Sequence, residues 1–534
     1  MLYIPIYLIF IPIISALIVY LFKNEHINYL TLVAQFAMSV LAITYFFYYR
    51  GDFSQTMFVF GGWEARIGIS LSNDPLSMTF IFLTIFAWWM VLLYVFDFKH
   101  THHNFLFFLM FLQGVFLGLI QTNDLFNMFV FLELTTIIVT ILIAFKKAGD
   151  SFRAGIYYLL INTSGVLAFL VGLIIIYYTF GTINIYEIQA MMPQLGDRGA
   201  VRLAYVLLMA GVSVKAAFFP VFTWLPKAHG AAQSAISALL SGLIVKGGIY
   251  LFIRVNTMFA PANLDVNHVF FAIGAASAIV GAIFALSQNS IKQLLAYSTV
   301  SQIGVILMAL SFDPTGFANG GVFHLVNHAI AKMALFFGAG MIIKVYKTKK
   351  LDELHGVFKA MPVISTSMII AMLSLSGLPF LSGYASKSVI KYQLEAGSLA
   401  YTIFYISNVL TPIILLRLGR IFIGPKVLSF TLKQPLQVLV MGLLGSSLVV
   451  LGLFFGPIFN GLWAEPFTQV SFFSLTSWLD YLSVILIAFL SFYFLIFHEK
   501  RVVRNIRHFS VSFETANVVF VAYIVFLATI YFIL

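Results

Sequence analysis

Apolar segments of about 20 residues recur along the whole sequence, and they constrain the fold more than any other feature. A helix needs about 20 apolar residues to cross the hydrocarbon core of a bilayer, where every backbone group has to be hydrogen-bonded within the protein. We therefore expect an all-α, polytopic transmembrane bundle of about 14–16 helices. The first segment has no basic flank or clear cleavage site, so we interpret it as a span and not as a signal peptide. The expected spans lie near 2–22, 28–49, 74–97, 104–120, 122–145, 154–180, 202–225, 230–256, 267–288, 293–311, 319–345, 361–396, 399–423, 436–459, 477–497 and 515–533.

The composition supports a membrane protein and excludes other classes. Of the 534 residues, 61% are hydrophobic and 9% are charged, whereas soluble domains carry about 25% charged residues. The net charge of +11 does not indicate nucleic-acid binding, because the basic residues lie in short loops and not on one polar face. The absence of cysteine excludes thiolate-bound iron–sulfur clusters and a cysteine nucleophile on this chain. We predict no cofactor site, so the chain is not itself a redox enzyme.

The basic residues between the spans are distributed unevenly. With sixteen spans, alternate loops form two sets, one with twenty Lys and Arg and the other with five. Because loops rich in Lys and Arg stay cytoplasmic, we predict a cell-membrane protein with both termini on the non-cytoplasmic side. The smaller set is Arg50, Arg66, Arg198, Arg202 and Arg254, and the larger is Lys23, Lys99, Lys146, Lys147, Arg153, Lys227, Lys292, Lys344, Lys347, Lys349, Lys350, Lys359, Arg417, Arg420, Lys426, Lys433, Lys500, Arg501, Arg504 and Arg507.

Six ionisable residues lie within the expected spans, away from the loops. A charge at the centre of a membrane helix costs about 2.5–3.5 kcal/mol on insertion scales and usually marks an ion pathway. Lysine suits proton transfer because burial brings the neutral amine within reach near pH 7. The alternative is a static buried ion pair, but one acid cannot pair with five lysines. Asp97, Asp124 and Asp480 lie near span ends, where an interfacial position explains them. The six residues are Glu133, Lys215, Lys246, Lys332, Lys387 and Lys391.

Two histidines and one lysine are spaced to share a helix face. His324, His328 and Lys332 lie at positions i, i+4 and i+8, which stacks them over two helical turns. An imidazole can take a proton on one ring nitrogen and release it from the other, so we predict a proton relay. Paired histidines also bind metals, but no further acid or cysteine lies close by in the sequence, and we predict no metal site.

Two spans contain helix breakers next to a buried lysine. Pro220 follows Lys215 by five residues, and a segment with glycine and proline, 374–383, precedes Lys387. Discontinuous helices at corresponding places in two halves are typical of transporters built from inverted repeats. We therefore expect two inverted repeats with helices broken near 220 and 380. The connections 181–201 and 346–360 mix polar and apolar residues and are expected to form short amphipathic helices at the interface.

With these residues the chain resembles the antiporter-like subunits shared by respiratory complex I, Mrp-type cation/proton antiporters and membrane-bound hydrogenases. The resemblance covers roughly residues 70–425, and the run that ends at Glu133 most resembles the D subunit of Mrp antiporters. It implies N-terminal transmembrane helices at 1–100, a first antiporter-like repeat at 101–256, a second at 257–425 and C-terminal transmembrane helices at 426–534. The matching segments are 122–133, 214–229, 238–246, 292–304, 324–332 and 383–387.

The resemblance also implies roles for the buried residues. Glu133 and Lys215 match the pair thought to gate proton uptake by electrostatic coupling. Lys387 matches the terminal residue on the twelfth helix, which exchanges protons with the outside, and Lys391 matches no family residue. The central hydrophilic axis is matched by Lys246, His324, His328 and Lys332.

The chain departs from the family pattern in two ways. The family often has aspartate where this chain has Lys227, and proline where it has Gln233. We expect a lysine at that cytoplasmic mouth to alter proton uptake there. The last two expected spans lie beyond the family core.

These features predict a proton-translocating subunit of a multisubunit complex, and the resemblance leaves open whether it also exchanges Na⁺. The expected partners are other membrane subunits, the lipid bilayer, H⁺ and Na⁺, with no nucleic acid. In one alternative the host is an NADH:quinone oxidoreductase or a membrane-bound hydrogenase, driven by redox chemistry on other chains. In another the chain is a structural subunit with a degenerate channel. A lipid-modifying enzyme would need paired acidic motifs at a membrane face, which the sequence lacks.

Overall fold

Helices account for nearly all of the chain wherever its structure is described. The computed structural model describes residues 3–50, 53, 57–64, 68–96, 102–146, 148–196, 198–262, 267–311, 320–394, 397–425, 435–463, 472–496, 506–507 and 511–533. The one sheet in these ranges is an antiparallel ribbon of β1 (Phe58–Val59) and β2 (Ser70–Leu71). Fifteen described helical segments are long and apolar enough to cross a membrane. The predicted all-α polytopic fold is confirmed.

Each expected span corresponds to one helix or to one interrupted helix. Short helices lie between the crossings: α7 (Ile185–Leu195), α15 (Val357–Ala360) and α20 (Phe455–Trp463). The predicted helix within 181–201 is thus present as α7, which buries Ile185, Ile188 and Met192 on one face. The uninterrupted crossings are α1 (Ile4–Phe22), α2 (Tyr29–Tyr49), α3 (Pro75–Val95), α4 (His103–Gln121), α5 (Leu125–Ala144), α6 (Gly149–Phe180), α12 (Asn267–Ser287), α13 (Ile291–Leu310), α14 (Gly320–Tyr346), α18 (Leu399–Gly419), α19 (Pro435–Leu453), α21 (Leu475–Ser491) and α23 (Phe513–Ile533).

Two boundaries differ clearly from the expected spans. Helix α6 begins at Gly149, ahead of residue 154, because a polar first turn extends it past the apolar stretch. Helix α19 ends at Leu453 and not near residue 459. The helix cannot continue there because Pro457 has no backbone N–H to bond to the carbonyl of Leu453.

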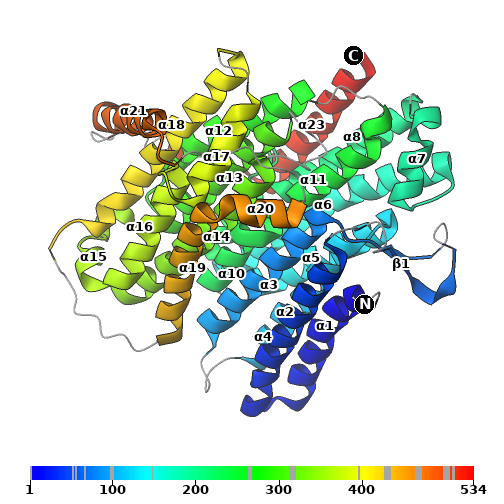
Figure 1. Ribbon diagram of the computed structural model, residues 1–534, viewed down its shortest axis with the longest axis horizontal. Coiled ribbons are helices and arrows are strands. Elements are labelled where there is room, and N and C mark those ends of the chain that lie inside the picture. Colours follow the sequence, from blue (N-terminus) through cyan, green and yellow to red (C-terminus); the bar gives the residue numbers. More distant parts are fainter. Residues whose placement is uncertain are drawn as a thin grey trace.

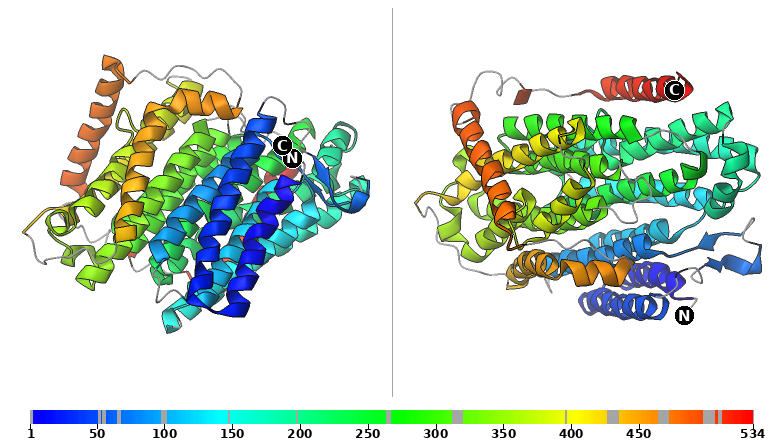
Figure 2. Two further views of the ribbon diagram at one scale, coloured as in Figure 1. Left: turned by 60° about the horizontal axis from the view of Figure 1, so that its bottom comes forward. Right: turned by 45° about the horizontal axis from the view of Figure 1, so that its top comes forward.

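The helices are arranged so that the polar segments lie at the centre of the bundle. Helices α1 and α2 pack with α4 and α3, and α19 lies beside α3 and α14 on the same side of the bundle (Figure 1). Helix α23 lies on the opposite side against α6 and α8, while α21 packs against α18 at one end (Figure 2). Within the crossing Ser234–Ala262, an 18-residue stretch is completely buried, and it places Lys246 in the interior.

Two of the predicted crossings are interrupted, as the sequence indicated. The first consists of α8 (Gly199–Ala216) and α9 (Trp224–Ala231), and the second of α16 (Pro362–Ser376) and α17 (Ser382–Gln393). Each first half ends in a left-handed residue, Ala217 with φ 56° and Gly377 with φ 89°. Both breaks therefore lie near residues 220 and 380, and the division into repeats that they suggested stays a prediction.

A third interruption was not predicted. The crossing Ser234–Ala262 consists of α10 (Ser234–Leu239), a π-helical turn at Leu240–Ile244, and α11 (Val245–Phe259). Single π-helical turns within α-helices occur frequently at functional sites. This turn directly precedes Lys246.

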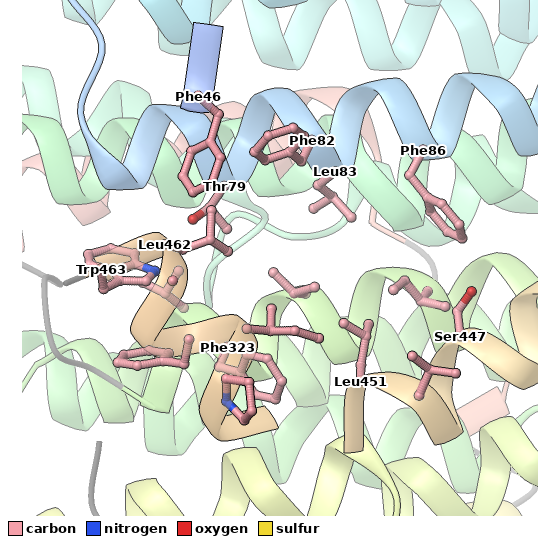
Figure 3. A pocket seen from close by; sticks show the side chains of 18 of the residues that line it. Phe46, Thr79, Phe82, Leu83, Phe86, Phe323, Ser447, Leu451, Leu462 and Trp463 are labelled. Carbon is pink, nitrogen blue, oxygen red and sulfur yellow. The ribbon is translucent and has the colours of Figure 1, made fainter. Parts of the chain in front are cut away.

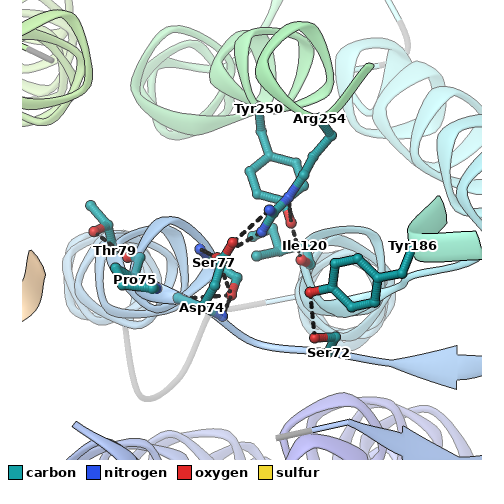
Figure 4. Close-up of polar contacts among 9 residues, drawn as sticks. All are labelled: Ser72, Asp74, Pro75, Ser77, Thr79, Ile120, Tyr186, Tyr250 and Arg254. Atoms are coloured by element: carbon teal, nitrogen blue, oxygen red, sulfur yellow. Dashed lines mark hydrogen bonds and ion pairs between the residues drawn. The ribbon is translucent and has the colours of Figure 1, made fainter. Parts of the chain in front are cut away.

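A buried ion pair joins α3 to α11 at one end of the bundle. Arg254 donates two hydrogen bonds to the carboxylate of Asp74, at 2.6 and 2.7 Å (Figure 4). Asp74 also caps α3 by accepting a hydrogen bond from the backbone N–H of Ser77 at 2.8 Å. The guanidinium Nε donates to the hydroxyl of Tyr250 at 2.8 Å, and that hydroxyl donates to the carbonyl of Ile120 on α4. These bonds tie three helices together.

Candidate functional site: a buried polar axis

Glu133 and Lys215 lie at one end of a line of buried polar groups. Glu133 projects from α5, and its Oε1 accepts a hydrogen bond from Thr163 at 3.3 Å. Lys215, in the last turn of α8, donates to the hydroxyl of Thr136 at 2.8 Å. Among the described residues the ion pairs within 4.0 Å do not include one between Glu133 and Lys215. The static ion pair considered above is therefore not present at these two residues.

A close helix contact brings Lys215 to the helix that carries Lys246. A Cβ atom at Gly248 would lie 2.4 Å from the backbone nitrogen of Ala216 and 2.7 Å from the carbonyl carbon of Lys215. Only glycine permits α11 to approach α8 so closely. The two lysines therefore lie on neighbouring, tightly packed helices.

Hydroxyl and backbone carbonyl groups lie between Lys246 and Lys332. The Lys246 amine donates to the carbonyl of Ser241 in the π-helical turn. The hydroxyls of Ser241 and Thr299 are 2.8 Å apart, and Thr299 donates to the carbonyl of Leu295 at 2.9 Å. The Lys332 amine donates to the same Leu295 carbonyl at 3.1 Å. These bonds hold α11, α13 and α14 together around the two amines, and because a carbonyl only accepts hydrogen bonds they do not themselves pass a proton.

The stripe His324, His328 and Lys332 lies on one buried face of α14, as the spacing predicted. His324 contacts Ser386 through Nδ1 at 2.9 Å and Gln302 through Nε2 at 3.0 Å, so it joins α14 to α17 and α13. Neither ring nitrogen of His328 has a hydrogen-bond partner within the described structure. His328 lies within electrostatic range of Lys246, Lys332 and His324. A buried imidazole whose two ring nitrogens both lack hydrogen-bond partners lowers the stability of the fold. The same free nitrogens are what an imidazole needs in order to exchange protons.

Lys387 lies at the far end of the axis, beside the second helix break. Its amine donates to the carbonyl of Leu375 at 2.7 Å, at the end of α16. Asn327 on α14 accepts hydrogen bonds from Ser374 and Ser382, both at 2.7 Å, and so joins the two sides of the break. The break thus exposes backbone carbonyl groups to the axis and supplies a partner for the lysine.

Two cavities differ in character from each other. The larger measures about 660 Å³, and its lining of side chains such as Phe82, Phe323 and Leu451 is almost entirely apolar (Figure 3). The other measures about 370 Å³ and is lined by Asp150, Arg153, Lys227 and other polar residues. Of these two cavities, the second has the polar lining that an aqueous entrance to the axis needs.

The sequence analysis missed two buried bases beside the axis. Lys292, which we counted among the loop residues, is buried at the start of α13 and donates to the carbonyl of Ala232 at 2.8 Å. His229 is fully buried, stacks on Phe336 with ring centroids 4.5 Å apart, and has no hydrogen-bond partner in the described ranges. Both lie in segments that carried the family resemblance, and that was the signal available for finding them. No group of three or more His, Cys, Asp or Glu able to hold a metal occurs among the described residues.

Comparison with known proteins identifies the family of the chain. Residues 122–412 match the family model described as NADH:quinone oxidoreductase/Mrp antiporter, transmembrane region. The chain is 30% identical over 386 residues to the protein named antiporter subunit mnhD2 of Staphylococcus aureus (strain JH9), covering 71% of this chain and 77% of that protein. The chain belongs to this family. The resemblance drawn from the sequence is therefore confirmed.

Two solved structures share the fold of this family member. A chain of the membrane-bound sulfane sulfur reductase, an archaeal respiratory membrane complex, has a TM-score of 0.80 at 24% identity, covering 91% of this chain and 99% of its own. A chain of the Mrp complex from Dietzia sp. DQ12-45-1b has a TM-score of 0.76 at 21% identity with the same coverage. The family match ends at residue 412, so α21 and α23 lie outside it.

Proposed function

We propose that this chain is a proton-translocating subunit of a multisubunit membrane complex and that protons move along the buried polar axis. Family membership supports ion translocation, and relatives are named as an antiporter subunit and as parts of membrane complexes. The observation that carries the proposal is the cluster of Lys246, His328 and Lys332, in which both ring nitrogens of His328 lack a hydrogen-bond partner among the described residues and the imidazole lies within electrostatic range of both amines. Such an imidazole can exchange a proton with either lysine, directly or through water, and separate structural lysines would not need it.

In this mechanism each residue has one role. The negative charge of Glu133 changes how readily Lys215 holds a proton. Uptake of a proton by Lys215 from the polar cavity is thereby coupled to its release toward Lys246. His328 and His324 carry the proton from Lys332 toward Lys387, because an imidazole accepts on one nitrogen and donates from the other. The low-dielectric interior makes each charge act strongly on the next.

The orientation is part of the same proposal. The excess of basic loop residues assigns the polar cavity with Arg153 and Lys227 to the cytoplasmic side and the neighbourhood of Lys387 to the outside. Lys227 lies over the ring of Tyr157 at 3.6 Å and donates to the carbonyl of Val511. Its positive charge at the mouth would slow the approach of protons, and this supports regulation of uptake there.

The host assembly can be of two kinds. The sequence relative is named as an antiporter subunit, which favours an Mrp-type assembly that exchanges Na⁺ for H⁺. The structural match to a respiratory complex favours a redox-driven host as the second candidate. Reconstituted flux that requires a Na⁺ gradient and no electron donor supports the first, whereas flux that requires an electron donor supports the second.

A direct test of the proposal uses the pair at the start of the axis. Glu133→Gln keeps the size of the side chain and removes its charge, and Lys215→Ala removes the amine. Each variant should assemble in membrane vesicles at the normal yield and lose proton flux. The control is Glu353→Gln, which changes an exposed acid that pairs with Lys350 and is not one of the axis residues. Normal flux in an assembled Glu133→Gln complex would contradict the proposed function.

A further inference from the structure

A cavity of about 790 Å³ adjoins Lys387 between α17, α18 and α21. Its lining includes Lys387, Lys391 and Asp480, together with polar groups such as Asn408 and Ser477. Lys387 is 7% exposed, so it lies at the inner wall of this cavity. The buried axis therefore ends at a wide polar chamber.

Lys391 and Asp480 form an ion pair at the mouth of this chamber. Lys391 follows Lys387 by one helical turn on α17, so the two amines share a face. The Lys391 amine donates directly to the carboxylate of Asp480 on α21, and the side chains are 43% and 62% exposed. Few residues of α21 are buried, yet this acid pairs with α17, the helix that carries Lys387. Resemblance to the family assigned no role to Lys391 or to this helix.

We propose that Asp480 is the outer proton-exchange group, held in place by Lys391, that receives the proton from Lys387 and passes it to the surrounding water. This inference rests on the proposed function and adds a residue from a helix outside the family match. In the step, an N–H bond of the Lys387 ammonium breaks and leaves a neutral amine. The proton forms an O–H bond with the carboxylate, directly or through water, and then leaves to solvent and restores the carboxylate.

The geometry favours exchange over a purely structural role for this acid. An ion pair with side chains as exposed as these contributes little to the stability of a fold. A largely exposed carboxylate that lines the same cavity as a buried lysine can instead exchange protons with solvent and, across the cavity, with that lysine. Lys391 keeps the carboxylate close to the chamber wall and acts as a positioning residue. The other titratable side chains that line the chamber are Tyr384, Tyr392, Tyr401, Tyr405 and Tyr481.

The test measures proton flux in vesicles that contain the assembled complex with Asp480→Ala. Flux should fall by roughly 10²-fold, the lower end for a lost acid–base group, because water in the chamber can accept part of the protons. Asp480→Glu should keep near-normal flux. Acetate or formate, added on both sides at millimolar concentration, should restore flux in Asp480→Ala, because a small carboxylate fits the chamber and replaces the missing acceptor. A structural defect would not respond to these anions.

Controls separate this inference from the proposed function. Glu353→Gln removes an acid from an ion pair of similar exposure at another site, and it should leave flux unchanged with or without acetate. If Glu133→Gln abolishes flux but Asp480→Ala transports protons like the wild type, the proposed role of Asp480 is wrong and the proposed function of the chain stands. Reduced flux that acetate and formate do not restore would also overturn it. Full flux in Glu133→Gln would instead overturn the proposed function.

Discussion

The ion pair between Asp74 and Arg254 allows a stability prediction with a stated size. The side chains are 17% and 13% exposed and share two short hydrogen bonds. Removing one partner of a buried pair typically costs 3–5 kcal/mol, because the remaining charge stays buried. Because both side chains keep some exposure to solvent, Asp74→Asn should lower the free energy of unfolding by an amount near the lower limit of this range, about 3 kcal/mol. Asparagine keeps the cap of α3, whereas alanine does not, so Asp74→Ala should cost about 1 kcal/mol more.

The assay is denaturant unfolding of the purified protein in mixed micelles, with the free energy of unfolding compared between variants. Glu353→Gln is the matched control, because its pair with Lys350 is exposed on both sides and its loss should change the free energy of unfolding little. The double variant Asp74→Asn with Arg254→Gln should lose less than the sum of the single losses, because neither change then leaves a charge unpaired. Equal losses for Asp74→Asn and Glu353→Gln, or additive losses in the double variant, would refute a buried, mutually dependent pair.

Four further predictions follow from the axis and the topology. His328→Gln should lower proton flux by about 10²–10⁴-fold at normal yield of the complex, and unchanged flux would remove this histidine from the path. Thr299→Val keeps the shape but removes a hydroxyl that would hold water between Lys246 and Lys332, so flux measured in vesicles should fall while the helix content by circular dichroism stays the same. Gly248→Ala should reduce the yield of assembled complex, because its Cβ would meet the backbone of α8 at 2.4 Å. Reporter fusions after Lys359 should indicate a cytoplasmic site and fusions after Leu534 an external site, and the opposite result at Lys359 would invert the topology.

The membrane helices were predictable from the sequence because bilayer thickness fixes the length of each apolar run. The stripe on α14 was predictable as well, since fixed helical geometry converts a spacing of four residues into one face. Both depend on residues close together in the sequence. The roles assigned to Glu133, Lys215 and the central residues stay proposals.

The features that the sequence did not reveal depend on residues far apart or on small polar groups. Asp480 lies 89 residues from Lys391, and nothing local marks it as a partner. Serine and threonine are common in membrane helices and usually bond to their own backbone, so the link from Ser241 to Thr299 had no distinct signal. The π-helical turn consists of Leu, Ser, Gly, Leu and Ile, which include no proline or charge. Tertiary packing alone decides these features.

The π-helical turn before Lys246 also sets the rotational phase of the helix that follows. Each residue of an α-helix advances by about 100° around the axis. A π-helical turn holds one residue more than an α-helical turn, so α11 is rotated by about that angle relative to an uninterrupted helix from α10. Deleting one residue from Leu240–Ile244 would remove the offset and turn Lys246, Tyr250 and Arg254 together to another face. One extra residue thus directs both the central lysine of the axis and the arginine of the Asp74 pair toward their partners.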